Sequence, residues 1–399
     1  MLYNYRNMNF LSSVCLPDSS QKVLTEYCQT TEEMLQNVLQ EMDSTAKCRI
    51  IPSADLGFPN NVLRLAGGFA TGLCIDWQCS RPFVPVDTTV NVCSSSICRL
   101  NVRNTDEIKS FFTSKRIQDV TEEMRKKNFL FNFASGNHFA MISVNKRREY
   151  FLVLHSSDNF YKDKVNGLYP NNQSWFKDQI HIYTDKTNHR ILRYLRDEAA
   201  QRFIRTARDN EDKNRIIHKE FSKALCGDYL DENAPVTHHH YGMPTDHTIA
   251  IGTCLLDETD TVPIFSTRGY PICLFQPNRQ TEKVTIDSRE KFLVPHGWGQ
   301  EIKGVRGIRL DLENKNLIIA TDKSDIINPI NSQSRISPEY ICVRDLRLNN
   351  TNYFSKEFEE KYLESWNGFL KGNLRDILYP VALYSRDCKE IEYYDETGR

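Results

Sequence analysis

Apolar residues recur at helical spacing in two stretches of the N-terminal half. The first covers residues from about 20 to 43, and the second runs from Thr105 to Lys127. An apolar period near 3.6 residues is typical of a helix that packs one face on a core. From about 49 to 100, short apolar runs are broken by Pro, Gly and Asn, which predicts strands and loops of a mixed sheet.

Two further apolar runs predict a pair of antiparallel strands. FLFNFASGNHFAMISV and EYFLVLHSS are rich in aromatic and branched residues, and a polar turn around Asn145 to Arg148 joins them. His138 lies in the first run and His155 in the second. These two imidazoles are therefore expected on neighbouring strands.

The second half of the chain alternates between charged helical and β-rich segments. Residues from about 189 to 225 are strongly charged with a helical period, which predicts one broken helix or a hairpin of two. Residues from Asp231 to about 345 are rich in turns and β-branched residues, and a last helix is predicted over about 355–378. No repeat or long flexible linker divides the chain. We predict a single α+β domain over residues 1–399, with a mixed sheet or sandwich core flanked by helices.

Composition indicates a globular protein and leaves the partner open. The chain has 399 residues, and 40% hydrophobic content is enough to bury a sizeable core. Lys plus Arg number 51 and Asp plus Glu number 52, so a polyanion must be met by a local patch. The N-terminal residues lack a signal-peptide pattern, and no stretch approaches the roughly eighteen apolar residues of a membrane span. We expect a cytoplasmic or nuclear protein with no membrane partner.

Cysteines give two candidate metal-binding segments. The chain has 12 cysteines without framework spacing, which predicts reduced thiols. Cys93 and Cys98, in CSSSIC, lack a second pair, so a structural role is the preferred interpretation. In CIDWQC, Asp76 and Cys79 can present a carboxylate and a thiolate from one tight turn. The alternative is a capping aspartate near a buried cysteine.

Histidines give stronger support for a metal site. The chain has 10 histidines, and the candidates lie in SGNHF, LHSS, THHHY and PHGWG. A neutral imidazole at a strand end is a good ligand for Mn, Zn, Fe or Co, although each histidine alone is more commonly a hydrogen-bonded core residue. In an extended segment His239 points away from its two histidine neighbours. His296, between a proline and two glycines, is free to attack or to donate a proton.

Taken in order, six short motifs resemble those of the RtcB family of RNA ligases. The family carries D-I-G-C-G, G-N-H-F, H-S-G-S-R, H-H-N, G-S-M-G and H-G-A-G-R. The counterparts in this chain lie, in the same order, at 76–79, 136–139, 155–157, 238–240, 266–269 and 296–299. The charged helical segment between His155 and His238 also fits the layout of that family.

The resemblance implies a two-metal site, usually manganese, with zinc or cobalt as alternatives. The cysteine would bridge both ions, and the implied ligands are Asp76, Cys79, His138, His155 and His239. His296 would attack the α-phosphate of GTP and become guanylylated. The residues implied to surround the nucleotide are Asn137, Ser266, Thr267, Gly269, Gly297 and Gly299.

The implied activity is the sealing of RNA ends in tRNA splicing or RNA repair. A 3′-phosphate or 2′,3′-cyclic phosphate end would be joined to a 5′-hydroxyl end through the histidine-nucleotide intermediate. One alternative is a metal-dependent phosphoesterase or cyclic-phosphate hydrolase on the same scaffold. Another is a catalytically impaired RNA-binding relative that keeps metal for folding. The sequence leaves open whether an activating protein partner is needed.

The chain also departs from the family at several positions. The proximal P-D-V-H of the family is Pro52-Ser53-Ala54-Asp55 here, and R-K-G is Ala250-Ile251-Gly252, which removes two cations. The last motif ends in Gln300 in place of arginine. The predicted metal ligands and nucleophile are kept. We therefore expect this chain to differ from the family in the nucleotide that it uses and in its affinity for RNA, rather than in metal binding.

Overall fold

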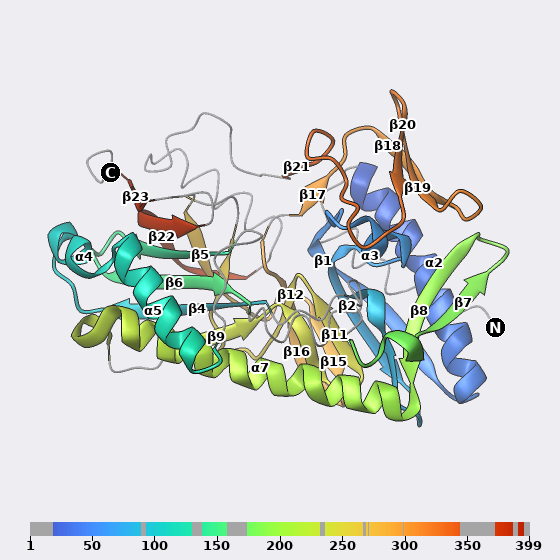
Figure 1. Cartoon of the computed structure of the whole chain (residues 1–399), viewed down its shortest axis with the longest axis horizontal. Coiled ribbons are helices and arrows are strands. Elements are labelled where there is room, and N and C mark those ends of the chain that lie inside the picture. The colour runs from blue at the N-terminus through green and yellow to red at the C-terminus, as the bar shows by residue number, and fades with distance from the viewer. Residues whose placement is uncertain are drawn as a thin grey trace.

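The protein is described from a computed structural model that covers residues 19–88, 93–129, 138–157, 174–231, 236–265, 269, 271–297, 299–343, 372–385 and 390–394. Helices flank several sheets in these residues, which confirms the predicted α+β class. Figure 1 shows strands at the left, in the centre and at the right of the molecule, with helix α7 (Asp197–Cys226) running along the lower edge beneath them. Each pairing between these strands is antiparallel in the described residues, so the mixed sheet that the sequence predicted is not seen there.

The largest sheet lies at the left of Figure 1 and carries most of the histidines discussed below. Its strand order is β13-β14-β22-β5-β6-β4-β9, and β23 pairs with β22. The strands are β13 (Val262–Ile264), β14 (Ile272–Gln276), β22 (Asn373–Ser385), β5 (Phe139–Val144), β6 (Tyr150–Ser156), β4 (Ser94–Leu100), β9 (Val236–His239) and β23 (Glu392–Tyr393). Helices α4 (Thr105–Phe111) and α5 (Ser114–Lys126) cover one face, because their apolar side chains join the same buried cluster.

A second sheet, at the right of Figure 1, has the order β1-β2-β11-β10. Its strands are β1 (Lys47–Gly57), β2 (Thr71–Gln78), β11 (Thr248–Ile251) and β10 (Tyr241–Thr245). Helix α2 (Ser19–Met42) packs on it through a buried apolar stripe that includes Leu24, Leu35 and Leu39. The short helix α3 (Val62–Ala66) connects β1 to β2, and Asn61 caps it by accepting a hydrogen bond from the Arg64 amide.

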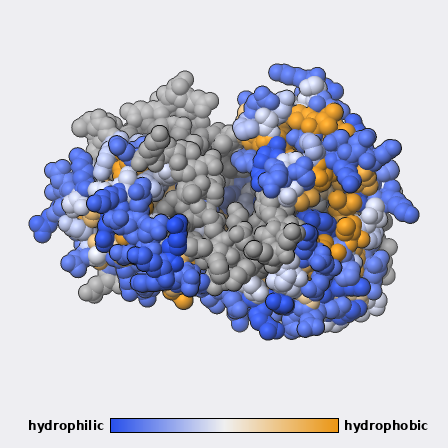
Figure 2. Space-filling view, viewed as in Figure 1, coloured by the Kyte–Doolittle hydropathy of each residue, from blue (hydrophilic) through white to orange (hydrophobic). Residues whose placement is uncertain are grey.

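Smaller sheets complete the described part of the chain. They are β12 (Thr253–Leu256) with β16 (Arg289–Pro295) and β15 (Lys283–Ile286), β17 (Gln300–Glu301) with β21 (Cys342–Val343), β18 (Val305–Asp311) with β19 (Asn316–Thr321) and β20 (Asp325–Pro329), and β3 (Phe83–Pro85) with β8 (Arg190–Arg196) and β7 (His181–Asp185). Single 3₁₀ turns lie at Val86–Thr88, Lys177–Gln179 and Gly227–Tyr229. Figure 2 shows hydrophobic residues gathered at the right-hand end and a largely hydrophilic surface along the lower edge.

The buried face of α7 carries polar side chains spaced four residues apart. Because residues four apart lie on one side of a helix, Asn214 and His218 both face strand β4. Asn214 Nδ2 donates to Ser94 Oγ at 2.6 Å, and the His218 ring lies 3.2 Å from Ser94 Oγ and 2.8 Å from Ser96 Oγ. Burial lowers the pKa of His218 to about 3, so this imidazole is neutral. These hydrogen bonds fix the position of β4 on the helix.

The sequence prediction was correct for the first helix and partly wrong for two others. Helix α2 closely matches the expected range, but 105–127 forms two helices that break at Phe112 and Thr113. The Thr113 side chain accepts from the Arg116 amide and so begins a new helix. Residues 190–196 were expected to be helical but form strand β8, because pairing with β3 and β7 outweighs their helical period. From Asp197 the chain forms one unbroken helix.

The prediction of a C-terminal helix over 355–378 is wrong for its last residues, 373–378. Residues 355–371 lie outside the described part of the chain, and Asn373–Ser385 form β22. This strand pairs with β14 on one edge and β5 on the other, so its backbone hydrogen bonds are satisfied by the sheet.

Among the described residues, ten cysteines are free thiols, as expected. None of the described helices is long and apolar enough to cross a membrane.

Helix α7 also contributes a pH-dependent contact with strand β10. Burial raises the pKa of the Glu211 carboxyl from 4.5 to about 7, and this carboxyl accepts a hydrogen bond from the Met243 amide. The folded protein therefore holds a proton that the unfolded chain releases above pH 4.5, and stability is lost as pH rises through 7. Glu211→Gln keeps the acceptor and removes this loss. We compare the free energy of unfolding of the variant with that of the wild type at each pH. We predict that the difference, variant minus wild type, is about 2 kcal/mol larger at pH 8 than at pH 5.

Urea denaturation of both proteins at the two pH values measures this difference. Asp209→Asn, on the exposed face of the same helix, is the matched control for loss of an acidic charge. A Glu211→Gln difference that stays constant with pH would show that the carboxyl is ionised in the folded protein.

Candidate metal and histidine site

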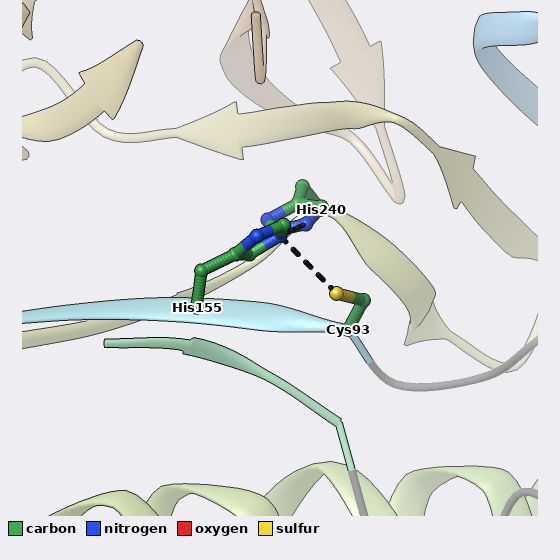
Figure 3. Close-up of side chains that lie close together, drawn as sticks. All are labelled: Cys93, His155 and His240. Atoms are coloured by element: carbon green, nitrogen blue, oxygen red, sulfur yellow. Dashed lines mark hydrogen bonds between the residues drawn. The ribbon is translucent and has the colours of Figure 1, made fainter. Parts of the chain in front are cut away.

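One thiol and two imidazoles meet inside the large sheet. Cys93, His155 and His240 are all buried, and one ligand atom from each lies within 4.8 Å of the others. Cys93 Sγ is 3.3 Å from His155 Nε2, and His155 Nε2 is 3.1 Å from His240 Nε2. Figure 3 shows the three side chains pointing toward one another. His138 Nε2 contacts the same thiol at 3.5 Å.

The register of neighbouring strands brings these residues together. In β6, His155 pairs with Ser95 of β4 on one side and with Phe139 of β5 on the other. Cys93 immediately precedes β4, and His138 immediately precedes β5, so their side chains reach the end of the sheet beside His155. His240 follows the last residue of β9, and its backbone amide donates to the Cys93 carbonyl at 3.1 Å. Strand ends that are far apart in sequence therefore supply one cluster.

The donor set and its spacing fit a metal ion. A tetrahedral zinc ion with N and S ligands separates two nitrogens by about 3.4 Å and a nitrogen from a sulfur by about 3.6 Å. The observed separations of 3.1 Å and 3.3 Å differ from these values by a few tenths of an ångström. Burial lowers the pKa of His240 well below its usual range, and the neighbouring imidazoles of His155 and His296 lower it further. A neutral imidazole has the free nitrogen lone pair that a metal requires.

His296 lies directly beside this cluster. Its ring stacks on the ring of His240, with centroids 5.1 Å apart and planes at 26°. Gly252 holds the two residues together, since its amide donates to the His240 carbonyl at 2.6 Å and its carbonyl accepts from the His296 amide at 3.4 Å. At φ +67°, Gly252 is in the left-handed region, and a Cβ there would lie 3.1 Å from His296 Cε1. Only glycine suits this position.

A buried carboxylate orients the imidazole of His296. Asp55, at 0% side-chain exposure, places Oδ2 2.7 Å from His296 Nδ1. A carboxylate can only accept, so the proton is assigned to Nδ1 and the lone pair of the ring to Nε2. The Ser53 hydroxyl donates to the other oxygen of Asp55. The pair therefore presents His296 Nε2 as a nucleophile or general base.

Two predicted ligands, Asp76 and Cys79, are not brought into the cluster. Both oxygens of Asp76 are engaged in β2: Arg49 donates to Oδ2 at 2.8 Å, and Thr248 donates to Oδ1 at 3.1 Å. Cys79 follows the end of β2 and is only partly buried. Burial raises the pKa of its thiol, and the charges that act on it come from Asp43, Arg81 and Asp197. The thiol that reaches the histidines is Cys93.

His239 faces the helix side of the sheet. It pairs across strands with Ser94, whose hydroxyl contacts α7. Burial lowers the pKa of His239 well below its usual range, and the nearby charge of Arg215 lowers it further. The alternation of side chains in β9 was foreseen, but it turns the middle histidine away from the thiol. His240, which lies at the bend after the strand, takes the place beside His155.

Three of the six residues expected around a nucleotide lie in the described part of the chain. Asn137, Ser266 and Thr267 lie outside the described residues. Gly269 has φ +76° and lies against the Tyr394 ring. The Gly297 backbone forms a bridge with Phe265, and the Gly299 backbone packs on Gly57 of β1. Gly297 is therefore adjacent to the His296 site, and Gly299 packs against the strand that carries Asp55.

Sequence reasoning missed Cys93, His240 and Asp55 as site residues. Cys93 carried a signal in CSSSIC, but the segment lacks the second cysteine pair that would have marked it as a ligand. His240 was one of three adjacent histidines, and only the position of the bend decides which one enters the cluster. Asp55 was noted as a departure from the P-D-V-H pattern. Its contact with His296 joins positions 241 residues apart and needed the fold to be seen.

Two comparisons with known proteins gave no match. The sequence matches no protein-family model, and it matches none of the curated proteins with which it was compared. The interpretation of the site therefore depends on its own geometry.

The geometry predicts which cysteine binds metal. Co²⁺ added to the wild-type protein should give a thiolate-to-cobalt charge-transfer band in the near ultraviolet, and Cys93→Ala should abolish it. Affinity for the metal should fall about 100-fold or more, because a ligand itself is removed. Cys79→Ala is the matched control and should keep the band. Loss of the band in the Cys79 variant alone would overturn this assignment.

Proposed function

We propose that the protein is a metal-dependent enzyme that acts on phosphorylated RNA ends, and that His296 carries a nucleotide during an RNA ligation. The observation that supports it best is the buried Asp55 carboxylate bonded to His296 Nδ1, beside a cysteine–histidine cluster suited to a metal. A covalent histidine intermediate requires an imidazole whose Nε2 is free to attack and whose positive charge is then stabilised, and this pair provides both.

The Asp55–His296 pair supports the first step chemically. His296 Nε2 would attack the α-phosphorus of a nucleoside triphosphate, forming an N–P bond as the P–O bond to pyrophosphate breaks. The ring becomes cationic when Nε2 is phosphorylated, and the Asp55 carboxylate would stabilise that charge through the proton on Nδ1. The side chain of His296 is 17% exposed, so it is accessible to a ligand while Asp55 stays buried.

The remaining steps follow from the chemistry of phosphate esters. A 3′-phosphate oxygen of one RNA end would take the nucleotide from His296, breaking the N–P bond. The 5′-hydroxyl of a second end would then attack the activated 3′-phosphorus, and the nucleoside monophosphate would leave. A terminal phosphate is a poor electrophile until one of its oxygens becomes such a leaving group. GTP is the nucleotide that the family resemblance suggests.

The cysteine–histidine donor set bears on the choice of metal. When bound, a divalent ion would act as a Lewis acid that neutralises charge on the phosphates. Thiolate and imidazole donors without a carboxylate, as found in the described cluster, suit zinc or cobalt better than manganese. His155, His240 and Cys93 would hold the ion, with His138 beside the same thiol. We therefore place Zn²⁺ or Co²⁺ ahead of Mn²⁺ for this site.

One observation favours the alternative of a phosphoesterase or cyclic-phosphate hydrolase. If Cys93 is the counterpart of the cysteine in D-I-G-C-G, the residue three positions before it is Val90 in place of the aspartate. The described donor group would then hold one ion, whereas the ligase family uses two. A single ion can activate water for attack on a cyclic phosphate, with His296 as general acid or base.

Nucleotide labelling of His296 tests the proposal. Purified protein with metal and each of four α-labelled nucleoside triphosphates should acquire acid-labile label, and His296→Ala should acquire none. Asp55→Asn should label about 100-fold more slowly or worse, because the amide no longer stabilises the charged ring. Asp76→Asn, which changes a carboxylate already paired with Arg49, is the matched control and should label at a near-normal rate.

Two results would reject the ligase. One is the absence of label from all four nucleotides in protein shown to hold metal. The other is equal labelling of wild type and His296→Ala. Hydrolysis of a 2′,3′-cyclic phosphate to a monoester without added nucleotide would then support the hydrolase as the function.

A further inference from the structure

Arg64 is a buried cation that pairs with no carboxylate among the described residues. It lies in α3 and is 6% exposed. Its Nη2 donates to the Ala70 carbonyl at 3.0 Å and to Thr71 Oγ1 at 2.9 Å, and its buried Nε meets no acceptor in the described part of the chain. No aspartate or glutamate in the described residues forms an ion pair with it. Burial of an unpaired charge is costly, so this guanidinium is expected to meet an anion from outside the chain.

The surroundings of Arg64 connect it to His296. The guanidinium carbon lies 5.3 Å from the ring centroid of Tyr241, and the Tyr241 ring is 6.0 Å from the His296 ring at 86°. Thr71, which accepts from Arg64, also approaches Gly252: a Cβ on that glycine would lie 2.6 Å from Thr71 Cγ2 and 3.1 Å from His296 Cε1. Tyr241 and Thr71 therefore link Arg64 to the surroundings of His296.

We propose that Arg64 binds an anionic phosphate group of the ligand that His296 acts on. Nη2 already donates to Ala70 and Thr71, so the Nε and Nη1 hydrogens are the ones that would donate to phosphate oxygens. A buried setting strengthens such charge-assisted hydrogen bonds. The Thr71 hydroxyl fixes the guanidinium in place, and the Tyr241 face stabilises its charge. The identity of the anion as phosphate rests on the proposed function, whereas the presence of an anion site beside His296 does not.

A second arginine in the chain provides a matched comparison. Arg190 is also buried, lies 3.6 Å from the centroid of the Tyr27 ring, and donates to Thr31 Oγ1 at 2.9 Å. It packs against α2, and the Asp185 carboxyl lies within its electrostatic reach. None of the histidines of the site contacts it in the described residues. Arg190 therefore has the same local structure without a place next to the nucleophile.

Pyrophosphate binding to the full-length, metal-loaded protein tests the proposal. Isothermal titration calorimetry at low ionic strength should give a Kd that rises about 10-fold or more in Arg64→Gln, because charge-assisted hydrogen bonding is lost. Arg64→Lys, which keeps the charge but replaces the guanidinium with an ammonium, should raise the Kd about 3-fold. Arg190→Gln should leave the Kd unchanged. Circular dichroism shows whether each variant is folded.

The outcomes separate this proposal from the ligase. Arg64-dependent binding of pyrophosphate in a protein that never labels His296 would keep the anion site and reject the ligase. Normal His296 labelling with a Kd that is the same in wild type and both Arg64 variants would reject the anion site alone. If Arg64→Gln does not fold, an unchanged Kd in Arg64→Lys overturns the proposal. So does a wild-type protein that does not bind pyrophosphate.

Discussion

The site depends on imidazoles that are buried together and cannot all be charged. His240 touches His155 and stacks on His296, and burial lowers its pKa well below the usual range. Neutral rings placed this close can hydrogen-bond to one another and to the Cys93 thiol. The same nitrogen and sulfur atoms could bind a metal ion. Donors from four separate segments thus converge at one sheet end.

Residues around the cluster, in helix α7, at Gly252 and in strand β1, hold these donors in place. Strand β4, which Cys93 precedes, is tied to α7 by hydrogen bonds from Asn214 and His218 to Ser94 and Ser96. Gly252 joins the backbones of His240 and His296, and Asp55 of β1 fixes the His296 ring. The site therefore lies where the two main sheets meet, and each sheet contributes part of the chemistry.

The sequence predicted the local elements better than the contacts among them. Helix α2 and the pair β5 and β6 follow from periodicity and turn residues, and these placed His138 and His155 on adjacent strand ends. The helices predicted over 190–196 and 373–378 are wrong because strand pairing with distant segments decides the structure of these residues. The same limit explains the site. The D-x-x-C spacing of Asp76 and Cys79 is visible in the chain, whereas the approach of Cys93 and Asp55 to the histidines is set only by the packing of the sheets.

An anomalous difference map from crystals of the zinc-loaded protein would show whether the buried cysteine and histidines bind the metal. We expect a peak at coordination distance, about 2.0 to 2.3 Å, from Cys93 Sγ, His155 Nε2 and His240 Nε2. His296 should lie next to that peak, with Asp55 still bonded to Nδ1. A peak beside Asp76 and Cys79, with none at the buried histidines, would show that the metal site lies elsewhere.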